Sequence, residues 1–251
     1  PAINYSGGER TRSQWMFHYQ VGSLEEEPPV LAARMVARGL QRAAVVFDQS
    51  PVGRRYAEAF EAARARLGLE VTDTAVISPL AEDAEPLLTR LRESDPDVLV
   101  YFGLGVASRA VALARIALAW DVPVLANSAL MFGYARPEWR DGYAGWEYLD
   151  TVADDNQVRA ALRAQSKRAA GPIGCAAYDI GRLLGEAVAR SEHLTRAGLA
   201  DGLRRVKQLP AASGHDGTLM GFGNYDHAAL KGHFLVLRAW REGRSVQVSD
   251  A

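Results

Sequence analysis

Apolar strand-like runs alternate with helix-like stretches along the first half of the chain, and this alternation limits the fold more than any other feature. Short runs rich in β-branched and aromatic residues predict strands, and apolar residues at helical spacing predict helices. The predicted strands are 43–48, 69–77, 97–102 and 122–127, and the predicted helices are 26–39, 54–67, 84–93 and 108–120. Because a helix separates each strand from the next, the pattern predicts an α/β fold with a parallel sheet covered by helices on both faces.

The second half of the chain follows a different pattern. Residues 128–143 are loop-like, and an aromatic run at 143–149 predicts a strand. The remaining elements are helices at 154–169, 175–190 and 195–206, the last with Thr195 as its N-cap, and a strand at 232–240 that ends at the turn of Glu242 and Gly243. No internal repeat is visible, and these elements do not by themselves complete a second lobe.

Composition excludes several classes of protein. A chain of 251 residues corresponds to one or two domains. Its 29 basic and 30 acidic residues give a net charge of −1, which argues against a nucleic-acid-binding protein. A single cysteine, Cys175, excludes an internal disulfide and a metal site built from cysteines. No run of 18 uncharged apolar residues occurs, so no membrane span is expected.

Motifs for catalysis are sparse. The segment Gly103-Leu104-Gly105-Val106-Ala107-Ser108 resembles a dinucleotide-binding turn, but Ser108 replaces the third glycine. The acid that would hold a ribose is also missing, because Asn127 and Ser128 end the next predicted strand. The sequence contains neither a P-loop nor a G-x-S-x-G nucleophile turn. We therefore interpret the glycine turn as a tight connection that faces a ligand.

Metal and cofactor sites are not predicted either. The five histidines do not form an H-E-x-x-H motif. The polar residues Asp216, Asp226, His227 and His233 lie in a turn-rich segment and are interpreted as surface groups. Residues 25–27 are all glutamate, which suits the positive N-terminal end of a helix, and a lone cysteine in an apolar helix is typical of a core.

Several segments, taken in order, resemble the type I periplasmic solute-binding proteins of the Leu/Ile/Val-binding family. They are residues 3–8, 15–19, 44–53, 59–60, 95–99, 177–187 and 232–243, which together span nearly the whole chain. His18 stands where this family usually has arginine, and Val52 where it usually has tyrosine. The resemblance implies a type I periplasmic-binding fold made of two parallel, doubly wound lobes.

The resemblance also implies a division into lobes. Residues 1–22 and 150–234 correspond to the remainder of a first lobe, and residues 23–149 and 235–251 to a complete second lobe. The family's first lobe begins about a hundred residues earlier by this comparison, so we expect the first lobe to be only partly represented.

By resemblance, the expected function is to capture a small solute outside the cytoplasm, between two hinged lobes, for an ABC importer. The implied partners are the solute and a membrane permease, with no nucleic acid and no cofactor. The protein would be periplasmic or extracellular, either exported or lipid-anchored. Two alternatives stay open: a ligand-sensing regulatory module of the same fold, and an enzyme that uses a nucleotide at the glycine turn.

The resemblance places a ligand site on both lobes. The residues that stand where amino-acid binders hold the ligand's carboxylate are Ser6, Gly7, Gly8 and Glu9. The residues that stand at or beside the ammonium-binding positions are Ser23, Val52, Leu104, Asn127, Ser128 and Ile173. Serines replace acids at 23 and 128, and aliphatic side chains replace aromatics at 52, 104 and 173.

These replacements change the ligand that is expected. A buried ammonium needs a charged partner or several acceptors, and a serine supplies no charge. The predicted ligand is therefore a small carboxylate or a neutral, largely apolar compound rather than a zwitterionic α-amino acid. Ser23, Asn127 and Ser128 would give polar contacts, and Val52, Leu104 and Ile173 the walls.

Overall fold

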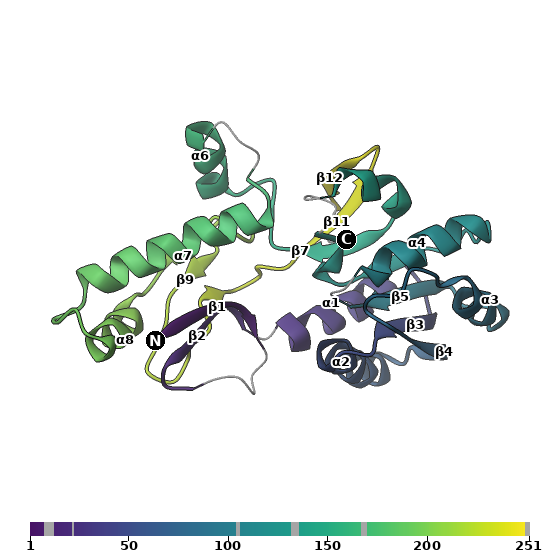
Figure 1. Cartoon of the computed structure of the whole chain (residues 1–251), viewed down its shortest axis with the longest axis horizontal. Coiled ribbons are helices and arrows are strands. Elements are labelled where there is room, and N and C mark those ends of the chain that lie inside the picture. The colour runs from purple at the N-terminus through teal and green to yellow at the C-terminus, as the bar shows by residue number, and fades with distance from the viewer. Residues whose placement is uncertain (8–12, 22, 104–105, 132–135, 167–169, 249–251) are drawn as a thin grey trace. The chain divides into compact units, whose positions relative to one another are not determined.

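The computed structural model describes the chain except for residues 8–12, 22, 104–105, 132–135, 167–169 and 249–251 (Figure 1). It divides into two compact units, each formed by two segments of the chain. Unit 1 comprises Pro1–Ser23 and Thr151–Val236, and unit 2 comprises Leu24–Asp150 and Leu237–Ala251. None of the helices in the described ranges combines the length and apolar character that crossing a membrane requires.

Unit 2 contains the strand–helix alternation that the sequence predicts. Its strands are β3 (Arg42–Asp48), β4 (Glu70–Ile77), β5 (Val98–Phe102), β6 (Val124–Ala126), β7 (Glu147–Asp150), β11 (Val236–Arg241) and β12 (Arg244–Gln247). Its helices are α1 (Ser23–Ala37), α2 (Pro51–Leu67), α3 (Glu85–Glu93), α4 (Ala107–Ala117) and the 3₁₀ turns η2 (Ser128–Met131) and η3 (Pro137–Tyr143). The sheet order is β12-β11-β7-β6-β5-β3-β4. Strands β3 to β7 pair in parallel and β12 is antiparallel to β11, so the predicted α/β fold is confirmed.

Helices cover both faces of this sheet. All five residues of the central strand β5 are buried. Leu99 and Tyr101 belong to the core shared with α3 and α4. Phe102, which points to the other face, stacks on Tyr56 of α2 at 5.6 Å between ring centroids. This two-sided burial explains why the strands read as continuous apolar runs.

Helix α2 begins earlier than the sequence suggested. The helix predicted from residue 54 begins at Pro51, after Ser50, whose hydroxyl accepts a hydrogen bond from the amide of Gly53 at 3.0 Å. Pro51 then occupies the first helical position, where its missing N–H is not needed. Gly68 ends the helix at a φ of 69°, in the left-handed conformation that glycine adopts without strain.

Gly53 is held too close to β3 to carry a side chain. A Cβ at this position would lie 2.2 Å from the carbonyl oxygen of Asp48. We expect Gly53→Ala to lower the free energy of unfolding by about 2 kcal/mol, measured by urea denaturation. Gly185→Ala is the matched control, because that helical glycine of α7 has no neighbour within 4 Å, and it should raise stability by about 0.5–1 kcal/mol. Equal effects of the two substitutions would contradict this account.

Unit 1 combines a parallel pair of strands with helices and a small sheet of very short strands. A parallel pair, β1 (Ala2–Gly7) and β2 (Met16–Val21), is followed by the helices α6 (Gln157–Ser166), α7 (Pro172–Ala189) and α8 (Arg196–Arg205). The two-residue strands β8 (Leu209–Pro210), β9 (Leu219–Met220) and β10 (Leu230–Lys231) form a small antiparallel sheet. Thr195 caps α8 as predicted, since its hydroxyl accepts from the amide of Gly198 at 3.1 Å.

Several predicted boundaries were wrong in this half of the chain. Residues 128–143, predicted as loop, include two 3₁₀ turns, and the strand predicted from 143 begins at Glu147. The last predicted strand begins at Val236 rather than 232, and β12, which follows the Glu242 turn, was not predicted. The helix predicted at 154–169 spans Gln157–Ser166 in the described residues. The bounds of these segments depend on turns and on short strand pairs. Neither of these leaves a long periodic pattern in the sequence.

A buried carboxyl organises the interior of unit 1. Asp179 of α7 is fully buried and accepts hydrogen bonds from Tyr19 Oη at 2.6 Å, Ala212 N at 2.8 Å and Ser213 N at 3.2 Å. Burial raises the pKa of Asp179, while these donors oppose the shift. One side chain thus joins β2, α7 and the segment after β8.

Candidate functional site

Polar residues and one glycine lie at the carboxyl edge of the unit 2 sheet, where its central strands end. Asp48 ends β3, Gly103 follows β5, and Asn127 and Ser128 follow β6. Ligands of open parallel sheets bind beyond this edge. We therefore take it as the candidate solute-binding edge of unit 2.

The side chain of Asn127 binds the backbone of Gly103 at this edge through two hydrogen bonds. Its side chain is fully buried, with Oδ1 accepting from Gly103 N at 3.3 Å and Nδ2 donating to Gly103 O at 3.0 Å. A Cβ on Gly103 would lie 2.6 Å from the Tyr101 hydroxyl and 2.8 Å from Asp48 Oδ2. A side chain at position 103 would therefore have to displace these two groups, and Asn127 fixes the backbone at the end of β5.

Asp48 connects the same edge to helix α2. Its Oδ1 accepts from the amide of Ser50 at 3.0 Å and also from the Ser50 hydroxyl. Because Ser50 in turn caps α2, the helix begins at a fixed place beside the end of β3.

Glu27 is a functional candidate that the sequence analysis missed. Its carboxyl, on α1, accepts from Ser128 N at 2.9 Å, from Ser128 Oγ at 3.1 Å and from Tyr56 Oη at 3.1 Å. The residue is 2% exposed, and burial raises its pKa to about 7. Glu27 stands at helical spacing from the apolar residues Leu31 and Met35, and all three are buried. This spacing is the sequence signal that could have placed Glu27 on the inner face of the helix.

The structure places the predicted ligand residues unevenly. Asn127 is buried and Ser128 half-buried, and Glu27 and Tyr56 join Ser128. Val52 is half-buried in the first turn of α2, whereas Ile173 is 58% exposed near the start of α7 in unit 1. Ser6 and Gly7 end β1, and Ser23 begins α1. Gly8, Glu9 and Leu104 lie outside the described residues.

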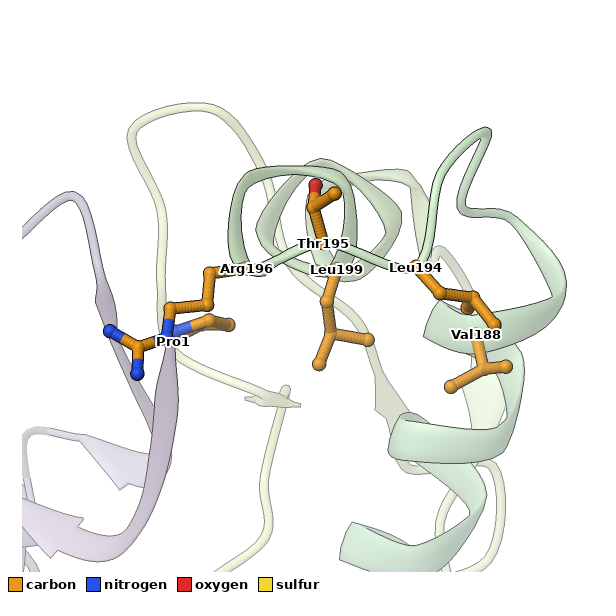
Figure 2. Close-up of a pocket in the computed structure, with 6 residues that line it drawn as sticks. All are labelled: Pro1, Val188, Leu194, Thr195, Arg196 and Leu199. Carbon is orange, nitrogen blue, oxygen red and sulfur yellow. The ribbon is translucent and has the colours of Figure 1, made fainter.

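Unit 1 also contains a cavity of about 620 Å³ between the start of β1 and the ends of α7 and α8 that face it (Figure 2). It is lined by Pro1, Val188, Leu194, Thr195, Arg196 and Leu199. The lining combines aliphatic side chains with the polar Thr195 and Arg196, and the Thr195 hydroxyl is already used in capping α8. Of the predicted ligand residues that the structure describes, none lines this cavity.

The polar cluster near the C-terminus does not converge on one point. Asp216, Asp226 and His233 are exposed as expected, and Asp226 pairs with Lys231. His227 is the exception to the surface interpretation, because it is buried and stacks on Phe17 at 4.2 Å between ring centroids. In the described part of the chain, no three His, Cys, Asp or Glu residues are grouped to hold a metal ion.

Comparison with known proteins agrees with this fold. The sequence matches the family described as periplasmic binding protein over residues 1–236, and the chain belongs to this family of solute-binding proteins. No curated protein matches the sequence. Many solved structures match, so the fold is widely represented.

Three of these structures illustrate the likeness. A type 1 periplasmic binding protein from Bordetella pertussis has 14% identity and a TM-score of 0.77, over 93% of this chain and 67% of its own. A leucine-binding protein from Thermotoga maritima has 14% identity and a TM-score of 0.80, over 95% and 68%. A putative branched-chain amino acid ABC transporter protein from Rhodospirillum rubrum has 20% identity and a TM-score of 0.70, over 94% and 68%. At these identities they establish the type I periplasmic-binding fold, and this chain spans about two thirds of their length.

Proposed function

We propose that this chain captures a small solute outside the cytoplasm and delivers it to the permease of an ABC importer. The observation that carries the proposal is the family match over residues 1–236, together with the type I fold. A neighbour described as an ABC transporter substrate-binding protein supports it. The protein acts by binding, without catalysis, and is exported or lipid-anchored. Permease and ATPase genes beside its own gene are expected.

The proposed lobes are residues 1–22 with 150–234, and residues 23–149 with 235–251. The proposed ligand contacts are the ten positions named from the resemblance, with Ser128 as the polar group offered by the edge of unit 2. Glu27 does not replace Ser128 in this role, because its carboxyl is buried and bound to Ser128 and Tyr56.

The proposed ligand is a small carboxylate or a neutral, largely apolar compound. Ser128 carries no charge, and an ammonium buried against it would lack a charged partner in direct contact. Isothermal calorimetry of the full chain should show micromolar binding of phenylacetate and none of leucine or valine. Binding of the two amino acids without binding of phenylacetate would reject this ligand class.

A further inference from the structure

Glu27 is a buried carboxyl that contacts the proposed ligand residue Ser128 through two hydrogen bonds. Its Oε2 accepts from the Ser128 amide at 2.9 Å, and its Oε1 accepts from the Ser128 hydroxyl at 3.1 Å. Tyr56 Oη donates to the same Oε1 at 3.1 Å, and Tyr56 is itself buried. Helix α1, which carries Glu27, is fixed to β7 by Arg34, whose Nε lies 2.8 Å from Glu147 Oε2. The carboxyl therefore has a defined place beneath the edge of unit 2.

The hydrogen-bonding capacity of Ser128 depends on the proton of Glu27. An ionised carboxylate only accepts, so the single hydroxyl proton of Ser128 is used by Glu27 and only oxygen lone pairs remain. A protonated Glu27 can donate to Ser128 Oγ, and the Ser128 proton is then free for another acceptor. Ser128 is half-buried, whereas Tyr56 is almost fully buried, so Ser128 is the hydroxyl able to meet a solute.

We propose that Glu27 is a positioning residue that sets, through its proton, whether Ser128 offers the solute a hydrogen-bond donor or an acceptor. The inference rests on the proposed function, because it takes Ser128 as a contact of the solute. It deepens that function by naming the preference: a carboxylate solute binds best while Glu27 is protonated. A carboxamide has both a donor and an acceptor, so it is indifferent to the change.

The surroundings of Glu27 place this change near neutral pH. Burial raises its pKa to about 7, although the Ser128 amide and hydroxyl and the Tyr56 hydroxyl favour the ionised form. Asp150, at the end of β7, adds a further negative charge that raises the pKa. Among the described residues, no ion pair joins Glu27 to an arginine or lysine.

The first test needs no ligand. In ¹H–¹⁵N spectra of the full chain between pH 5.5 and 8.5, the amide of residue 128 should titrate with a midpoint near 7, and Glu27→Gln should abolish the titration. Ser128→Ala should move the midpoint upward, because the ionised form loses a donor. The control Glu58→Gln, at a 66% exposed side chain of α2, should leave the titration unchanged. An amide that does not titrate, or a midpoint that Ser128→Ala leaves in place, would overturn the inference.

The second test uses phenylacetate and phenylacetamide as probes of the same shape. Phenylacetate should bind about tenfold more weakly at pH 8 than at pH 6, because the protonated fraction of Glu27 falls about tenfold, and phenylacetamide should not change. Glu27→Gln should remove the difference. Equal affinity of phenylacetate at both pH values in the unaltered protein overturns the inference. If neither probe binds at any pH, the proposed ligand class fails, and the amide titration alone decides the role of Glu27.

Discussion

Replacing Asp179 by alanine should lower the free energy of unfolding by about 3–5 kcal/mol. The substitution removes the acceptor of the buried amides of Ala212 and Ser213, and it removes one of two acceptors of the Tyr19 hydroxyl, which can still donate to Ser213 Oγ at 2.7 Å. A buried donor left without a partner costs about 1–3 kcal/mol. Part of this cost is offset, because burial disfavours the charge of Asp179, which its raised pKa reflects. The sum is therefore smaller than three full penalties.

Urea unfolding of the full chain, followed by circular dichroism, measures this effect. Asp179→Asn keeps one acceptor oxygen and should cost less, about 1–3 kcal/mol. Asp201→Ala is the matched control, because Asp201 is 61% exposed and pairs with Arg204 across one turn of α8. Its loss should change stability by no more than about 0.5 kcal/mol. If Asp179→Ala costs as little as the control, the carboxyl does not organise unit 1.

The sequence predicted unit 2 better than unit 1, and the reason is the length of the patterns. Strands such as β5 lie between two helical layers, so their apolar runs and the helices that follow repeat over many residues. Strands β8, β9 and β10 have two residues each, which is too few for any periodicity. Their positions follow from contacts such as that of Asp179 with Ala212, residues that are 33 positions apart in the sequence.

The candidate site divides in a similar way. Asn127 and Ser128 were predicted because the end of a parallel strand marks a binding edge. The partners of these two residues were not predicted. Asn127 binds the backbone of Gly103, and Glu27, 101 residues earlier in the sequence, accepts a hydrogen bond from Ser128. Three consecutive glutamates at a helix start suggested favourable surface charges, and the helical spacing of Glu27 with Leu31 and Met35, all three buried, was not used.

Glu27→Gln should change the pH dependence of stability by about 3 kcal/mol between pH 4.5 and 8. Burial raises the pKa of Glu27 from 4.5 to about 7, so the folded protein holds this proton more tightly than the unfolded chain does. The stabilisation due to the bound proton is therefore complete below pH 4.5, declines as the pH rises, and is lost above pH 7. A rise of the pKa from 4.5 to about 7 corresponds to about 3 kcal/mol.

Glutamine cannot ionise, so the variant should gain on the unaltered protein as the pH rises. Whatever constant cost the new amide brings, the free energy of unfolding of the variant minus that of the unaltered protein should be about 3 kcal/mol higher at pH 8 than at pH 4.5. Glu58→Gln removes an exposed carboxylate from the same unit and should change stability by no more than about 0.5 kcal/mol at either pH. Urea unfolding at the two pH values provides the measurement. The difference in stability between Glu27→Gln and the unaltered protein could instead be the same at both pH values. That result would mean that Glu27 stays in one protonation state, and the Ser128 hydroxyl would then keep one hydrogen-bonding role.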